Sequence, residues 1–136
     1  MTELDLINLG RSMTSNEIGL FTQIITVTFA MIVAIYYFLQ NASLAMKIFA
    51  FVAYTFGFFL FFGEMLLEQS MKIVLIGTLK AFPHKSYVGQ EYAGLTDSWL
   101  SHVTAFLFNG SIWLLWCGIF FLLFFGKRHL SSDRAP

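Results

Sequence analysis

The sequence predicts an all-α integral membrane protein with three transmembrane helices, and its composition, length and hydropathy support that class. Of its residues, 57% are hydrophobic and only 12% are charged, whereas soluble domains carry about 25% charged residues. A chain of 136 residues has too little interior to bury so many apolar side chains, so the lipid bilayer must cover much of its surface. The length also fits a single membrane domain, residues 1–136.

The first span is expected at residues 18–39, an uncharged apolar run long enough to cross a hydrocarbon core of about 30 Å as a helix. Residues 14–17, with the sequence TSNE, match a capping box and predict that the helix begins there. The acidic segment before the run and the lack of a small-residue cleavage motif after it favour a retained helix over a signal peptide. Residues 4–10 indicate a short N-terminal interfacial segment, or else a frayed end.

The second span is expected at residues 48–67. Only residues 40–43 separate it from the first run, and so short a connection predicts an antiparallel hairpin. Glu64 and Glu68 lie one turn apart on the same helix face. We expect the helix to leave the membrane near Glu68 and to continue, or bend, into an interfacial extension that ends before Pro83.

The third span is expected at residues 98–126, after a polar loop at residues 84–96 that carries Gly89 and Gly94. The span is followed by a basic segment, residues 127–129, which marks its end. Three spans place the two termini on opposite sides of the membrane.

The distribution of basic residues gives a predicted orientation, because Lys and Arg near the membrane prefer the cytoplasm. Each side of the membrane would hold four basic residues. Lys127 and Arg128 adjoin the membrane directly, and the N-terminal segment is net acidic. We therefore expect the N-terminus outside and the C-terminus in the cytoplasm, in a bacterial inner membrane.

A polar and aromatic stripe on the third span is the main candidate site. Its members follow spacings of four, three, four and three residues, which places them on one helix face, and Gly110 beside them would allow close approach of another helix. Because a lone amide in hydrocarbon needs a partner, we interpret the stripe as a helix-packing surface. The alternatives are a ligand or quinone-like pocket walled by the two Trp rings, and a water-filled path past the amide. The stripe consists of His102, Phe106, Asn109, Trp113 and Trp116.

The first two spans carry possible counterparts of this stripe. Gln23, Thr26 and Ala30 form a small and polar face on the first span that favours helix packing, and Gln23 could pair with His102. For Asn109 the corresponding depth is near Thr28 or Ala30. Glu64 is interpreted as an interfacial carboxylate, with an ion- or proton-linked role as the alternative.

The sequence lacks the motifs of nucleotide-binding proteins, metalloproteases and metal-binding proteins. It contains no nucleotide-binding glycine loop and no zinc-protease motif. The three His are scattered along the chain and Cys117 is the only cysteine, so no metal site or disulfide is expected, and no cofactor. A formal net charge of zero gives no reason to expect nucleic acid as a partner.

The predicted function is therefore that of a small, non-enzymatic polytopic membrane protein. Its helices would pack into a homo-oligomer, or into a larger membrane complex as an accessory subunit. The first alternative is a pore former, since three spans with a basic tail resemble some phage holins in architecture. The second is a small-ligand or lipid-binding protein, coupled to protons through Glu64.

Overall fold

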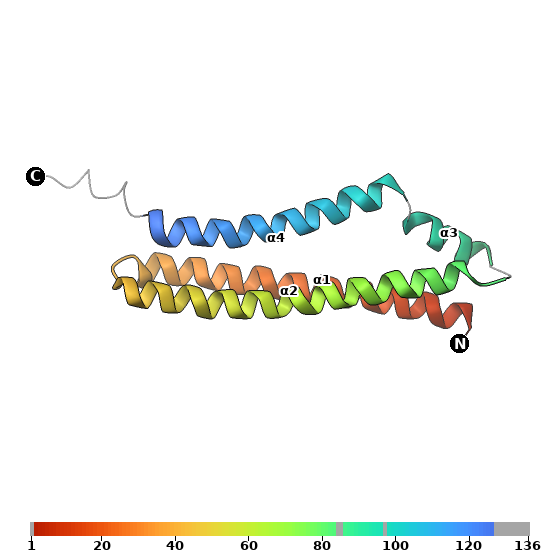
Figure 1. The fold of residues 1–136 in the computed structure, drawn as a ribbon, viewed down its shortest axis with the longest axis horizontal. Helices are drawn as coiled ribbons and strands as arrows, with labels where there is room; N and C mark the ends of the chain where they lie inside the picture. Colours follow the sequence, from red (N-terminus) through yellow and green to blue (C-terminus); the bar gives the residue numbers. More distant parts are fainter. Residues whose placement is uncertain (1, 84–85, 97, 127–136) are drawn as a thin grey trace, which may run out of the picture.

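The computed structural model describes residues 2–83, 86–96 and 98–126, and every regular element in these segments is helical. Figure 1 shows α1 and α2 as an antiparallel hairpin with α4 lying along it, parallel to α1, while α3 lies at the end of the hairpin near the N-terminus. Three of the helices are long and apolar enough to cross a membrane. The predicted all-α fold with three membrane-length helices is thus confirmed. The elements are α1 (Glu3–Ala34), the π-helical turn η1 (Ile35–Leu39), α2 (Leu44–Lys80), α3 (Tyr87–Thr96) and α4 (Trp99–Phe125).

The predicted helix start at residues 14–17 is wrong, because α1 begins at Glu3. The capping box lies at its true start, where the amide of Thr2 donates to Asp5 Oδ2 at 2.8 Å and the amide of Asp5 donates to Thr2 Oγ1 at 3.3 Å. Hydrogen bonding from Thr2, first from its backbone amide and then from its side chain, lowers the pKa of the exposed Asp5 carboxyl. The TSNE segment lies inside the helix, where the Thr14 hydroxyl donates to the carbonyl of Gly10 at 3.0 Å.

Packing against α2 explains why α1 starts so early. The first turns of α1 bury apolar side chains against the last turns of α2, which runs unbroken to Lys80. Tertiary contact of this kind stabilises a helix more than its local propensity does. We call this cluster the end core; it comprises Leu6, Ile7, Met13, Leu75, Ile76 and Leu79, with Phe82 and Tyr92 packed against it.

The predicted polar loop at residues 84–96 is also wrong where the structure describes it, because residues 87–96 form α3. The carboxylate of Glu3 accepts hydrogen bonds from the amide and the hydroxyl of Ser86, just before the helix, at 3.1 and 2.9 Å. The α3 backbone approaches this carboxylate so closely that a Cβ at position 89 would overlap it. The glycine therefore marks a close contact between helices rather than a loop.

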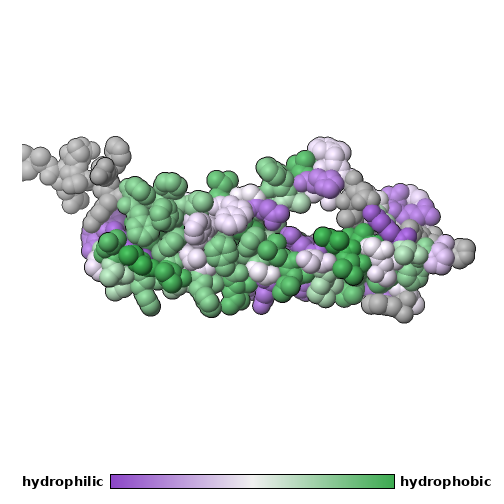
Figure 2. Space-filling view, in the orientation of Figure 1, coloured by the Kyte–Doolittle hydropathy of each residue, from purple (hydrophilic) through white to green (hydrophobic). Residues whose placement is uncertain are grey.

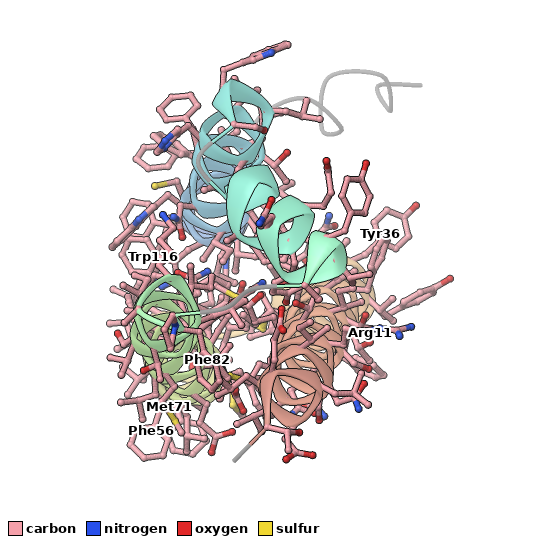
Figure 3. The ribbon with its side chains drawn as sticks, turned by 90° about the vertical axis from the view of Figure 1, so that its right-hand side faces the viewer. Arg11, Tyr36, Phe56, Met71, Phe82 and Trp116 are labelled. Carbon is pink, nitrogen blue, oxygen red and sulfur yellow. The ribbon has the colours of Figure 1, made fainter. Side chains whose placement is uncertain are left out.

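A second cluster, the inner core, joins α1, α2 and the part of α4 from Phe108 onward. Its most deeply buried members are Ile24, Phe58, Met65, Ile112 and Ile119, each 2% exposed or less. Viewed along the helices, α1, α2 and α4 occupy the corners of a triangle, with Phe56 and Met71 pointing outward from α2 and Tyr36 from α1 (Figure 3). The inner core fills the middle of that triangle.

The contact between Gly89 and Glu3 yields a first prediction. Gly89→Ala should displace the Glu3 carboxylate and loosen α3, although alanine is the better helix former. Gly94→Ala in the same helix meets open space and should stabilise α3 by up to about 1 kcal/mol. Amide hydrogen exchange of α3 measures both variants. Equal protection of α3 in the two would contradict the proposed role of this contact.

Candidate functional site

Charged residues divide the hairpin into two sections. No charged side chain occurs at residues 18–39 of α1 and η1, at residues 48–63 of α2, or at residues 105–126, which are the later part of α4 and its C-cap. We call these aligned segments the apolar band, and hydrophobic side chains cover most of the face where the three helices run together (Figure 2). The end core lies beyond one edge of the band.

Polar contacts between α1 and α2 mark that edge. Asn16 Nδ2 donates to Glu68 Oε1 at 3.3 Å. Lys72 Nζ forms an ion pair with Glu17 Oε2 at 3.2 Å, with side chains 26% and 13% exposed. Both contacts join residues at the same height of the antiparallel helices. They mark the place on the hairpin where the apolar band ends.

A polar groove of about 330 Å³ lies between α1 and α2 at the same edge. It opens on the face of the hairpin that α4 does not cover. Phe21, whose ring centroid lies 4.2 Å from that of Phe108 in α4, is about 200° around α1 from Gln23 at 3.6 residues per turn. The groove is lined by Ser15, Asn16, Gly19, Leu20, Gln23, Glu64 and Glu68.

The structure brings together two residues that the sequence did not connect, Gln23 and Glu64. Both line the polar groove, and neither makes a hydrogen bond or ion pair with another residue of the described segments. His102 is exposed on α4, so the anticipated Gln23–His102 pair is not formed between these described side chains. The pair does not form because α4 packs against the face of α1 opposite to Gln23.

An aromatic seam joins α4 to α2. The rings of Trp113 and Trp116 meet edge to face at 6.4 Å between centroids, and both contact Phe59 at 6.1 Å. Trp116 Nε1 also donates to Thr55 Oγ1 at 3.2 Å. The two Trp of the predicted stripe thus lie against another helix, although Trp113 remains 49% exposed.

The rest of the predicted stripe has different surroundings. Phe106 is 76% exposed. Asn109 is partly buried, and its Oδ1 is shielded from solvent without a hydrogen-bond donor in the described part of the chain. The Phe21–Phe108 contact places Asn109 at the height of Thr22, near the edge of the apolar band, rather than at the expected height of Thr28 or Ala30.

The small residues predicted on the first span lie on its outer surface. Thr26 and Ala30 are exposed, and the Thr26 hydroxyl donates to the carbonyl of Thr22 at 2.8 Å. Together with Gly19 and Gln23, which are also exposed, they follow spacings of four, three and four residues. We call Gly19, Gln23, Thr26 and Ala30 the outer stripe.

Sequence reasoning missed the buried polar contact in the middle of the band. The hydroxyls of Thr28, 2% exposed, and Tyr54, 5% exposed, lie 3.0 Å apart. Thr28 also donates to the carbonyl of Ile24 at 2.8 Å. The position of the two residues in the sequence could have predicted the contact, because they lie at nearly equal distances from the short connection of an antiparallel hairpin.

The described part of the chain contains no group of three His, Cys, Asp or Glu side chains that could bind a metal ion. Cys117 is a free, exposed thiol on α4. His84 and His129 lie outside the described residues.

The unpaired carbonyl of Asn109 gives a second prediction. In the isolated chain in mild detergent, Asn109→Leu should raise the free energy of unfolding by about 1 kcal/mol, because it removes a buried acceptor that costs about 1–3 kcal/mol when unpaired. Thr55→Val is the matched control; it removes the acceptor of Trp116 and should lower stability by about 0.6 kcal/mol. Thermal or denaturant unfolding measures both changes. A clear loss of stability in Asn109→Leu would show that the amide has a partner.

Comparison of the chain with models of protein families, with curated proteins and with solved structures gives no significant match.

Proposed function

We propose that this chain is a non-enzymatic subunit of a membrane-protein assembly and that it binds a neighbouring transmembrane helix through the outer stripe of α1. The neighbour belongs either to a second copy or to a larger complex. The observation that carries the proposal is the outer stripe itself, a row of small and polar side chains exposed within the apolar band of α1. Apart from Thr22, the other side chains that α1 exposes there are large and apolar.

The shape of the outer stripe favours a helix over lipid as its neighbour. Gly19 and Ala30 leave the α1 backbone accessible, and small residues at this spacing allow two helices to approach closely. Most other exposed side chains of the apolar band are large and suit acyl chains, with Thr22, Ala53, Ala105 and Cys117 as the small exceptions. Examples of the large side chains are Phe49 and Phe56 on α2 and Leu114 and Phe121 on α4, which are 61–75% exposed.

The polarity of the outer stripe favours the same conclusion. Gln23 lies about one turn inside the apolar band, where lipid offers its amide no hydrogen bond. A neighbouring helix with a polar side chain at that depth would satisfy it, at an average of about 0.6 kcal/mol per bond. Thr26 needs no such partner, because its hydroxyl donates within α1.

The alternatives draw less support from the geometry. A pore within one chain needs a common polar face, yet Gln23 lies in the polar groove while Asn109 belongs to the helix on the other side of the hairpin. Ser111 donates to the carbonyl of Phe108 at 2.8 Å, within its own helix. The polar groove, with Glu64 in its wall, is where a proton-coupled ligand would bind if the chain has that role.

The proposal includes a placement in the membrane. The apolar band spans the hydrocarbon core of a bacterial inner membrane, and the end core with α3 stands beyond its outer surface. The N-terminus is then outside and the basic C-terminus cytoplasmic. Reporters fused separately to the two termini decide this orientation.

A third prediction tests the outer stripe. A photo-crosslinking residue at Val33, which is exposed beside the stripe, should form adducts in native membranes. Gln23→Leu should lower their yield about threefold, the equivalent of one average interhelical hydrogen bond, and Ala30→Phe should abolish them by blocking close approach. The mass of the adduct distinguishes a second copy from another protein.

Ala45→Phe is the matched control, since it makes the same change at an exposed alanine of α2 away from the outer stripe. It should leave the adducts unchanged. Absence of protein adducts at Val33, or equal loss in Ala30→Phe and Ala45→Phe, would contradict the proposal.

A further inference from the structure

The two parts of α4 have different surroundings. From Phe108 onward one face is buried, with Ile112, Ile119 and Leu123 at 4% exposed or less. From Trp99 to Leu107 no side chain is buried. Figure 1 shows this first part of α4, which we call the free arm, turning away from α1 and α2. Figure 2 shows an opening between it and the hairpin.

The residues where the two parts meet weaken a helix. Gly110 and Ser111 form a Gly/Ser pair, one of the few sequence features at which helices bend sharply. The Ser111 hydroxyl donates to the carbonyl of Phe108 at 2.8 Å, a type of bond that favours bending. The Phe21–Phe108 ring contact anchors α4 just before this pair, so the free arm ends next to the Gly/Ser pair.

The far end of the free arm follows α3, which is fixed to the hairpin. The carboxylate of Glu3 holds the backbone and hydroxyl of Ser86. The ring of Tyr92 lies so close to Gly10 that a Cβ there would come within 2.6 Å of its hydroxyl. Because so few residues separate α3 from α4, the position of α3 limits where the free arm can lie.

We propose that residues 109–111 form a hinge and that α3 acts as a latch which holds the free arm away from α1. Release of α3 lets α4 straighten, so that the free arm closes on residues 12–20 of α1, the segment that lies at the same height. This motion is separate from the proposed assembly through the outer stripe, which lies on the other face of α1.

Distances between spin labels at positions 11 and 104 test the proposal in the full chain in lipid nanodiscs. Both side chains are exposed, and Arg11 points from α1 away from α2 (Figure 3). The labels are attached to Arg11→Cys and Thr104→Cys after Cys117→Ser removes the native thiol. The unmodified hinge should give a main long distance and a minor short one.

Two variants should shift this balance toward the short distance. Gly110→Ala removes the backbone freedom of glycine at the hinge and should shift the distance distribution toward the short distance; its Cβ meets open space. Glu3→Ala releases the latch and should act in the same direction.

Gly118→Ala is the matched control, because it makes the same change in the packed part of α4, also in open space. It should leave the distances unchanged. The hinge is excluded if Gly110→Ala has no effect or the same effect as Gly118→Ala. The latch is excluded if Glu3→Ala leaves the distances unchanged.

Discussion

The length of the hairpin helices sets the plan of this protein. α1 with its π-helical turn and α2 each extend over 37 residues, about 55 Å at 1.5 Å per residue, whereas the hydrocarbon core of a bilayer is about 30 Å thick. Roughly 25 Å of each, the first part of α1 and the last part of α2, must therefore meet another environment. The sequence changes where that would happen, from the uncharged apolar band to the contacts of Asn16 with Glu68 and of Glu17 with Lys72.

In the proposed membrane placement, the two ends of the hairpin are stabilised in different ways. The end core buries Leu6, Leu75 and Leu79 away from water, so the hydrophobic effect acts there as in a soluble protein. In the apolar band, where lipid is as apolar as the side chains, packing and polar contacts must hold the helices together. The Thr28–Tyr54 and Trp116–Thr55 contacts supply directional bonds at the middle of the band, and each is modest in energy.

The sequence predicted the fold class and the three spans because long uncharged runs are a strong signal. It failed at residues 14–17 because a local capping pattern does not reveal that Leu6 and Met13 pack on α2. It failed at α3 because Gly89 and Gly94 suggested a loop, whereas Gly89 serves a close approach to Glu3. Helix periodicity placed His102 and Trp116 on one stripe. Periodicity cannot show, however, that His102 lies in the free arm, which diverges from the hairpin, whereas Trp116 lies in the part of α4 that packs on α2. The outer residues Gln23, Thr26 and Ala30 were identified by spacing, and the burial pattern shows which way they face.

The central claim is that lipid solvates the apolar band while the end core stands in water. It is tested most directly by spin labels placed singly along α1 in bilayers, with accessibility to oxygen and to a water-soluble nickel complex measured at each position. Labels at Phe29 and Val33, exposed within the band, should contact oxygen and not nickel, whereas labels at Asn8 and Ser12, exposed beyond it, should contact nickel. Nickel access at Phe29 and Val33, or exclusion of nickel from Asn8 and Ser12, would contradict the account.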